Sequence, residues 1–267
     1  MNRRTFVRRS LVAGAVGLGA GAGYARFVER HAVEVVPVGL ELGLPEPLTA
    51  AVLGDIHFDP LFEVDYLEDV VARTNRLAPD LVLYTGDFLS RSADRLPDLL
   101  AVLRKARAGA GRFAVLGNHD HWVGADPVAA AFPAAGIPVL RNQSVPLSGR
   151  KDWYVTGLES YWSGAPNTTS LAATPPHARH ILLVHEPDSF DLLTDPRIAL
   201  QVSGHTHGGQ VRVPGVGAVC LPSWGKKYQA GLYSRGDRKL YVNRGIGTVD
   251  RHVRLNCRPE ITLLKLT

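Results

Sequence analysis

Short apolar runs that end in polar residues recur along the first half of this chain. Residues 48–54 lead into Asp55, residues 81–85 into Gly86-Asp87, and residues 112–116 into Gly117-Asn118. Apolar runs of this length, bounded by turn residues, predict buried β-strands. Between them, residues 64–77 and 96–106 carry apolar side chains at helical spacing. We therefore expect strand–helix–strand units of about 30 residues, with parallel pairing of the strands.

The second half of the chain is richer in strands. Two of its apolar runs lead into His185 and His205. We expect strands over residues 153–157, 180–184, 200–203, 211–213, 231–233, 239–242 and 261–266. The pattern predicts an α/β fold in which two mixed β-sheets pack as a sandwich flanked by helices. Ligand sites in open α/β sheets lie beyond the carboxyl ends of strands, where each polar motif of this chain falls.

The chain divides into three expected segments. Residues 1–25 read as a leader, and residues 26–47 read as a connector because three prolines interrupt them. Residues 48–267 then form one domain with a large core, since 45% of the 267 residues are hydrophobic.

The leader resembles a twin-arginine export signal. Arg3-Arg4-Thr5-Phe6-Val7-Arg8 precedes an apolar stretch from Leu11 to Ala22 that is rich in glycine and alanine. This stretch is shorter than the roughly 20 residues that span a bilayer. We expect export by the twin-arginine machinery to the periplasm or cell envelope. An uncleaved leader would act as an anchor and associate the protein with the membrane surface.

The net charge argues against a nucleic-acid partner. The formal charge is +5, but four arginines and no acidic residue lie in the first 25 residues, so the rest carries only +1. A basic nucleic-acid face is therefore not predicted. Cys220 and Cys257 have no metal-ligand spacing, and whether they pair in an oxidising compartment stays open.

Seven side chains of metal-binding types follow the expected strands. Asp55 and His57 are two residues apart and would project to the same side if the strand continued. Asp87 has two oxygens and could bridge two cations. Seven ligands are too many for one tetrahedral ion and suit two ions that share a carboxylate. The seven candidates are Asp55, His57, Asp87, Asn118, His185, His205 and His207.

The order of these motifs resembles that of the calcineurin-like metallophosphoesterase superfamily over residues 50–210. Segments 225–228, 231–233 and 243–247 resemble a bacterial branch of often exported or membrane-associated phosphodiesterases. The resemblance implies one ion held by Asp55, His57 and His207, and a second held by Asn118, His185 and His205, with Asp87 between them. It also implies that His119 stands near the leaving group and that Asp120 orients His119.

A dinuclear phosphodiesterase is the function that this resemblance implies. A hydroxide bridging two divalent ions would attack phosphorus in line, while His119 assists the leaving group. Manganese, iron, zinc and cobalt all suit these ligands. The expected substrate is a small phosphodiester. The alternatives are a UDP-2,3-diacylglucosamine-type pyrophosphohydrolase acting on a lipid-linked pyrophosphate, a nuclease, and a metal-binding surface module without turnover.

Other residues are weaker candidates for a substrate pocket. Trp153, Tyr161 and Trp162 could line one, although packing is their more common role. Tyr228 and Arg244 are better candidates because their segments follow the histidine cluster.

Overall fold

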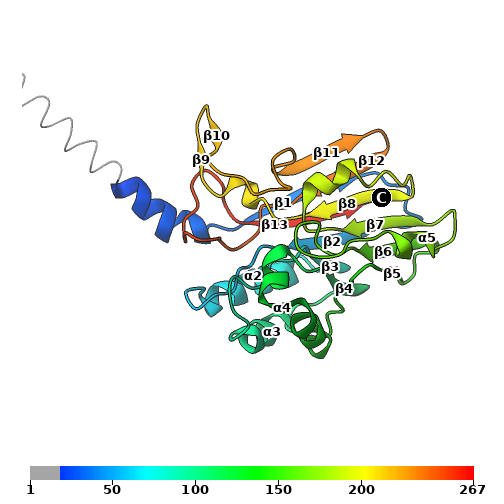
Figure 1. Cartoon of the computed structure of the whole chain (residues 1–267), viewed down its shortest axis with the longest axis horizontal. Helices are drawn as coiled ribbons and strands as arrows, with labels where there is room; N and C mark the ends of the chain where they lie inside the picture. The colour runs from blue at the N-terminus through cyan, green and yellow to red at the C-terminus, as the bar shows by residue number, and fades with distance from the viewer. Residues whose placement is uncertain (1–18) are drawn as a thin grey trace, which may run out of the picture.

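Two β-sheets packed face to face form the centre of the molecule, and helices cover the outer face of one of them (Figure 1). The computed structural model describes residues 19–267. The first sheet has the order β1 (Glu34–Leu40), β13 (Glu260–Leu266), β2 (Leu48–Leu53), β3 (Leu81–Tyr84) and β4 (Gly111–Ala114). The second has the order β11 (Gly231–Arg235), β12 (Arg238–Val242), β8 (Ile198–Ser203), β7 (Arg179–Leu183), β6 (Trp153–Gly157) and β5 (Gln143–Pro146).

Parallel pairs predominate in both sheets, as the strand–helix–strand pattern predicts. β2, β3 and β4 run parallel, and so do β6, β7 and β8. The antiparallel pairs β13–β2 and β11–β12 make both sheets mixed. The predicted α/β sandwich of two mixed sheets is therefore confirmed.

Helices and short elements surround the sheets. The α-helices are α2 (Val64–Arg76), α3 (Leu96–Leu103), α4 (Asn118–Ala131) and α5 (Thr169–Ala172). The 3₁₀ turns are η1 (Glu29–His31), η2 (Phe132–Ala135), η3 (Pro187–Asp191) and η4 (His207–Gly209). A small hairpin of β9 (Arg212–Val213) and β10 (Gly217–Ala218) projects from one end of the molecule, as Figure 1 shows.

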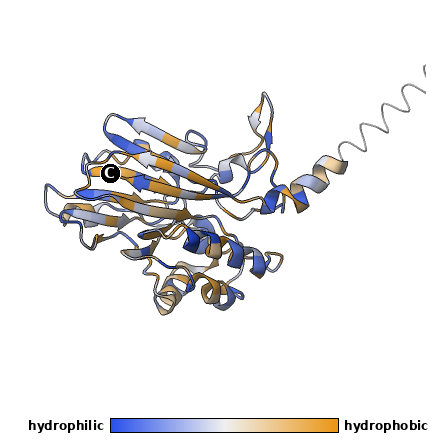
Figure 2. Ribbon diagram, turned by 180° about the vertical axis from the view of Figure 1, so that it is seen from behind, coloured by the Kyte–Doolittle hydropathy of each residue, from blue (hydrophilic) through white to orange (hydrophobic). Residues whose placement is uncertain are grey.

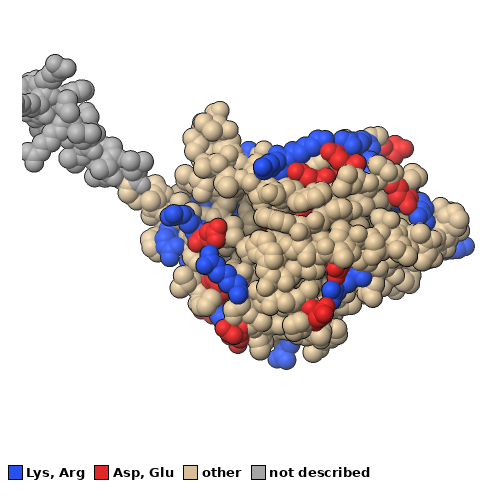
Figure 3. All heavy atoms as spheres, in the orientation of Figure 1, with Lys and Arg blue, Asp and Glu red and all other residues tan. Residues whose placement is uncertain are grey.

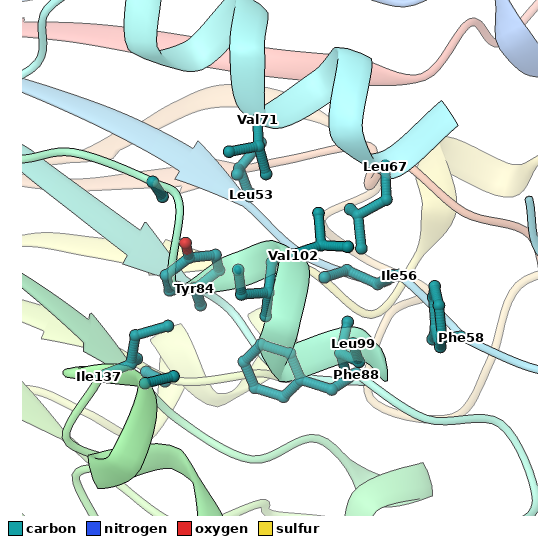
Figure 4. Close-up of a cluster of buried hydrophobic side chains, with 14 of the residues drawn as sticks. Leu53, Ile56, Phe58, Leu67, Val71, Tyr84, Phe88, Leu99, Val102 and Ile137 are labelled. Carbon is teal, nitrogen blue, oxygen red and sulfur yellow. The ribbon is translucent and has the colours of Figure 1, made fainter. Parts of the chain in front are cut away.

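Two apolar layers hold the sandwich together. Strand residues such as Val52, Leu83 and Val202 fill the space between the sheets. The other face of the first sheet packs under α2, α3 and α4, where Leu53 of β2 lies beside Val71 of α2 in one apolar cluster (Figure 4). Figure 2 shows the corresponding hydrophobic strands and the mixed polar and apolar character of the helices. The core therefore fixes the strand ends from which the polar motifs extend.

The prediction that residues 26–47 are a connector is wrong, because β1 occupies the middle of this segment. β1 pairs in parallel with β13, with Pro37 opposite Leu263. An edge strand has one row of unpaired N–H groups, so a proline is tolerated there. Proline therefore does not exclude a strand in this segment.

The N-terminal leader falls mostly outside the described residues, since residues 1–18 are not among them. Residues 19–27 are helical. Between residues 19 and 267, no helix has the length and apolar character needed to cross a bilayer.

Candidate metal centre

The seven candidate ligands converge where strands of both sheets end. Asp55 and His57 follow β2, Asp87 follows β3, and Asn118 is the first residue of α4, after β4. His185 follows β7, whereas His205 and His207 follow β8. The first sheet thus supplies four of these side chains and the second sheet three. All seven are buried.

Five of these residues adopt left-handed backbone conformations. The φ angles are 49° at Asp55, 50° at His57, 53° at Asp87, 73° at His205 and 51° at His207. Non-glycine residues rarely adopt positive φ, and such strain persists only where the surroundings enforce it. The expectation that Asp55 and His57 share one side of a continuing strand is wrong, because β2 ends at Leu53. They reach the same site from a loop.

Close backbone contacts enforce these loops. The amide of Asp55 donates to the Gly86 carbonyl at 2.9 Å, and that of His57 donates to the Asp87 carbonyl at 3.0 Å. A Cβ on Gly86 would lie 2.5 Å from the amide nitrogen of Gly117. Glycine lets the loops after β3 and β4 pack directly against each other.

One group of ligand atoms comes from Asp55, His57 and His207. The Nε2 atoms of His57 and His207 are 3.0 Å apart, and Nε2 of His207 lies 3.6 Å from Oδ1 of Asp55. Oδ2 of Asp55 and Nδ1 of both histidines are buried without a hydrogen-bond partner. Buried polar atoms normally have partners, so this group has the character of an ion site.

A second group comes from Asp87, His185 and His205. Nδ1 of His185 contacts the Thr85 carbonyl at 2.7 Å, and Nε2 of His205 contacts the Ser223 carbonyl at 2.7 Å. A carbonyl only accepts, so these ring nitrogens carry the hydrogens when the rings are neutral. The lone pairs of His185 Nε2 and His205 Nδ1 then face each other at 3.1 Å. Facing lone pairs suit a shared cation.

Asp87 lies between the two groups. Its Oδ2 atom is 3.5 Å from Nε2 of His57 and 3.2 Å from Nε2 of His185. Asn118 adds a buried Oδ1 atom without a hydrogen-bond partner. The donor set therefore fits two divalent cations that share one carboxylate.

Burial sets the protonation of the ligands. It lowers the pKa of His57 to about 3 and that of His205 to about 4, and it lowers the pKa of His207 well below the usual value. Neutral imidazoles have the lone pairs that metals require. Burial opposes the charged forms of both Asp87 and His185, but the attraction between them holds the pKa of Asp87 well below its usual range and raises the pKa of His185 well above its usual value. His185 must therefore lose a proton to act as a ligand. Burial also raises the pKa of Asp55 to about 7, and an adjacent cation would oppose that effect.

His119 lies beside this cluster, in the first turn of α4. Its ring centre is 4.7 Å from that of His57, and the residue is half-buried. Nδ1 of His119 contacts the Ser90 carbonyl at 2.8 Å. Together with His57 and Asp87 it could form a third ligand group, but those two residues already belong to the two groups above.

Asp120 makes no hydrogen bond to the ring of His119 and bonds to the backbone instead. Its Oδ1 atom accepts from the amides of Phe88 at 2.9 Å and Leu89 at 3.1 Å. Its Oδ2 atom accepts from the amide of Gly117 at 3.0 Å and so caps α4. Asp120 therefore fixes the backbone of two loops, one of which carries Ser90.

Tyr228 and Arg244 do not line the cavity at the ligand cluster, although sequence reasoning favoured them. The Tyr228 hydroxyl donates to Asp191 at 2.8 Å and its ring packs against Phe190. Arg244 forms ion pairs with Glu260 and Glu34 behind the histidine loop. Both residues stabilise the second half of the fold.

Sequence reasoning did not predict the roles of three residues at the site. Trp122, which was not considered, and Trp162, for which packing was preferred, both line the cavity at the cluster. Arg254 is fully buried, and its guanidinium donates to the carbonyls of Gly247, Gly245, Arg244 and Cys257. It thereby holds the loop whose Gly247 amide donates to the Asp55 carbonyl at 2.9 Å. Arg254 is an isolated arginine after the motifs, and nothing in the sequence around it predicts this role.

The two cysteines do not pair. Cys220 is exposed and Cys257 is buried. The Cys257 thiol donates to the His207 carbonyl at 3.2 Å and so supports the ligand loop.

Comparisons with known proteins agree with this geometry. A family model described as calcineurin-like phosphoesterase matches residues 48–209. The uncharacterized metallophosphoesterase YkuE of Bacillus subtilis strain 168 is 33% identical, with 100% of this chain and 98% of that protein covered. Phosphodiesterase YaeI of Escherichia coli K12 is 32% identical, with 100% and 99% covered. The solved structure of TT1561 from Thermus thermophilus is similar in fold, with a TM-score of 0.50 at 13% identity over 75% of this chain and 91% of that one.

Proposed function

Because the chain belongs to the calcineurin-like phosphoesterase family, and is thus a metal-dependent phosphoesterase with a dinuclear centre, we propose that it hydrolyses phosphodiesters. The observation that carries the proposal is the position of Asp87 between two groups of buried ligand atoms, with His119 beside them. The name of the relative YaeI, a phosphodiesterase, supports the diester class.

The proposed ligands follow the two groups of side chains. Asp55, His57 and His207 would hold one ion, Asn118, His185 and His205 would hold the other, and Asp87 would contribute to both. Manganese, iron, zinc and cobalt all accept this mixture of carboxylate, amide and imidazole donors. When bound, the ions neutralise charge on the phosphate oxygens and lower the pKa of a bound water.

The side chains of the protein complete the reaction. Hydrolysis breaks the ester P–O bond, bonds the oxygen of a water to phosphorus and releases an alkoxide that needs a proton to become an alcohol. The contact of Nδ1 with Ser90 fixes the His119 ring, so Nε2 is the nitrogen free to give that proton to the leaving oxygen. Asp120 and Ser90 position the ring through the backbone.

The charge around the cavity favours a diester over a monoester. Arg251 is the one arginine or lysine among the described residues that line the cavity at the cluster. A diester brings one negative charge to the site, whereas a monoester brings close to two at neutral pH. Monoester sites therefore need more cationic groups beyond the metals.

Hydrolysis of bis(4-nitrophenyl) phosphate tests this proposal. Manganese-loaded protein should hydrolyse this diester at least tenfold faster than 4-nitrophenyl phosphate. It should not cleave DNA, since the chain after residue 25 carries a formal charge of only +1. Faster hydrolysis of the monoester would contradict the diester assignment, cleavage of DNA would identify a nuclease, and no turnover of either ester would favour a binding module.

We further propose that residues 1–25 direct twin-arginine export to the cell envelope. The Arg3-Arg4 pair before an apolar stretch supports this. Cell fractionation of the full chain beside an R3K/R4K double variant tests it. The variant should accumulate in the cytoplasm, and equal distribution of the two proteins would contradict the proposal.

A further inference from the structure

His119 stands at the junction of two cavities of different character. The metal-side cavity measures about 630 Å³ and has His57, Asp87, Asn118, His205 and His207 at its inner end. The second cavity measures about 470 Å³ and shares His119, Val249 and Asp250 with the first. Both volumes are large enough for a ligand group of their own. A substrate whose phosphorus lies at the metals can therefore extend one arm into each.

A pair of tryptophans forms one wall of the metal-side cavity. Trp122 packs against His119 with ring centres 4.6 Å apart, and against Trp162 at 5.3 Å. The ring of Trp162 lies 5.6 Å from that of His205. Trp122 is 55% exposed and Trp162 41% exposed. Large aromatic side chains that are solvent-exposed beside a catalytic cluster are suited to binding the substrate.

Four valines also line the metal-side cavity, and its lining continues to the base of the projecting hairpin. They are Val211, Val219, Val249 and Val253, and the polar side chains of Gln210, Asp250 and Arg251 lie among them. Val219 is 63% exposed, and Val216, in the turn between β9 and β10, is 77% exposed. On the face that Figure 3 shows, the hairpin carries no charged side chain. The apolar surface thus leads outward from the metals.

The second cavity has a larger share of hydroxyl and charged side chains, although apolar groups line it as well. Ser90, Ser92 and Asp94 line it, together with Arg91 and Arg95. Both arginines are held by acidic partners, Arg91 by Asp250 and Arg95 by Asp98. This cavity therefore offers hydrogen-bonding groups beside the apolar side chains of Phe58, Pro60 and Leu61.

We propose that the preferred substrate is an asymmetric phosphodiester with one long aliphatic ester arm and one polar arm. The aliphatic arm lies between the tryptophan pair and the valines, and the polar arm lies in the second cavity. The inference rests on the proposed phosphodiesterase function and names its substrate class. A nucleoside arm could also stack on tryptophan, but the long valine wall favours an alkyl chain because it gives area without hydrogen bonds.

A series of 4-nitrophenyl alkyl phosphodiesters tests this inference. The methyl, butyl and octyl esters share one leaving group, so only the alkyl arm changes. With the wild-type holoenzyme below the micelle concentration, kcat/KM should rise about two- to fourfold per methylene over the first few carbons. The thymidine 5′-(4-nitrophenyl) ester should be hydrolysed less efficiently than the octyl ester.

Variants of the apolar walls localise the effect. Trp162→Ala and Val219→Ser should each lower the ratio of octyl to methyl kcat/KM at least fivefold, whereas Trp162→Phe should restore most of it. Val35→Ser is the matched control, because Val35 is 40% exposed on β1 and lines neither cavity. Its ratio should equal that of the wild type.

The outcomes separate this inference from the proposed function. Hydrolysis of every ester without dependence on chain length would overturn the aliphatic arm and leave the phosphodiesterase intact. Preference for the thymidine ester would overturn it in favour of a nucleoside arm. No hydrolysis of any ester by metal-loaded protein would overturn the proposed function itself.

Discussion

The Nδ1 atom of His119 lies 2.8 Å from the carbonyl oxygen of Ser90. Since a carbonyl cannot donate, this contact leaves Nε2 as the nitrogen that can exchange a proton with a ligand. Ser90 follows Phe88 and Leu89, whose amides both donate to Asp120. Asp120 thus reaches His119 through the backbone of the loop after β3, and the two residues have separable roles.

Replacing His119 should slow catalysis without removing metal. We expect His119→Ala to lower kcat on a dialkyl phosphodiester, whose leaving alkoxide must be protonated, by about 10²- to 10⁴-fold, the usual contribution of a general acid. The same variant should lower kcat much less on bis(4-nitrophenyl) phosphate, whose leaving group departs without a proton. Metal content by mass spectrometry should match that of the wild type. Loss of an ion in step with activity would instead make His119 a ligand.

Replacing Asp120 should mainly destabilise the fold. Asp120→Ala leaves the buried amides of Gly117, Phe88 and Leu89 without an acceptor, at about 1–3 kcal/mol each before relaxation. Urea unfolding should show a loss of several kcal/mol. Asp126→Ala is the control on the same helix, because that side chain is 87% exposed and its ion pair contributes about 1 kcal/mol or less. Equal stability of the two variants would refute the backbone role.

A methyl group at Gly86 should disturb the loops that carry the ligands. The φ of Gly86 is 96°, and a Cβ there would lie 2.5 Å from the Gly117 amide nitrogen. We expect Gly86→Ala to lower both the free energy of unfolding and the metal content. Gly39→Ala is the control, since a Cβ there meets nothing within 4 Å. A Gly86→Ala protein as stable as Gly39→Ala would argue against close loop packing.

Stability should depend on pH through His180. Burial lowers the pKa of His180 to about 4 in the folded protein, from an ordinary value of 6.5. Its ring nitrogens contact the hydroxyls of Thr156 at 2.8 Å and Thr174 at 3.1 Å. Between pH 6.5 and pH 4 the unfolded chain binds a proton that the folded chain does not, so stability falls as pH falls through this window.

Urea unfolding at pH 7 and pH 5 measures this effect. In His180→Gln, which keeps a hydrogen-bonding side chain but cannot titrate, the loss of stability between the two pH values should be smaller than in the wild type. Other titrating groups contribute equally to both proteins. An unchanged loss would show that His180 is protonated in the folded state.

Much of the fold could be predicted from local pattern. The residues that became β6, 153–157, show their whole extent as one apolar run, and the apolar spacing over 64–77 marks α2, which ends at Arg76. β1 was not predicted because its half-buried and exposed positions alternate around a proline, which a sheet tolerates at its edge. An edge position depends on pairing with β13, more than 200 residues later, which local pattern does not reveal.

The site was predictable as a set of residue types but not as a geometry. The resemblance to the calcineurin-like superfamily grouped Asp55 with His207, which lie far apart in the chain and close together in the fold. The left-handed backbone at these residues could not be predicted, because it arises from contacts between loops of different strands. The roles of Trp122 and Arg254 could not be predicted for the same reason, since these roles arise from packing in the folded protein.

Metal content of the Asp87→Ala variant tests the central claim most directly. If Asp87 contributes to both groups of ligands, the wild type should hold two ions per chain after dialysis and Asp87→Ala should hold neither. His185→Ala should lose one ion, because it removes a ligand from one group only. An Asp87→Ala protein that is folded by circular dichroism and still holds one full equivalent of metal would contradict the shared carboxylate.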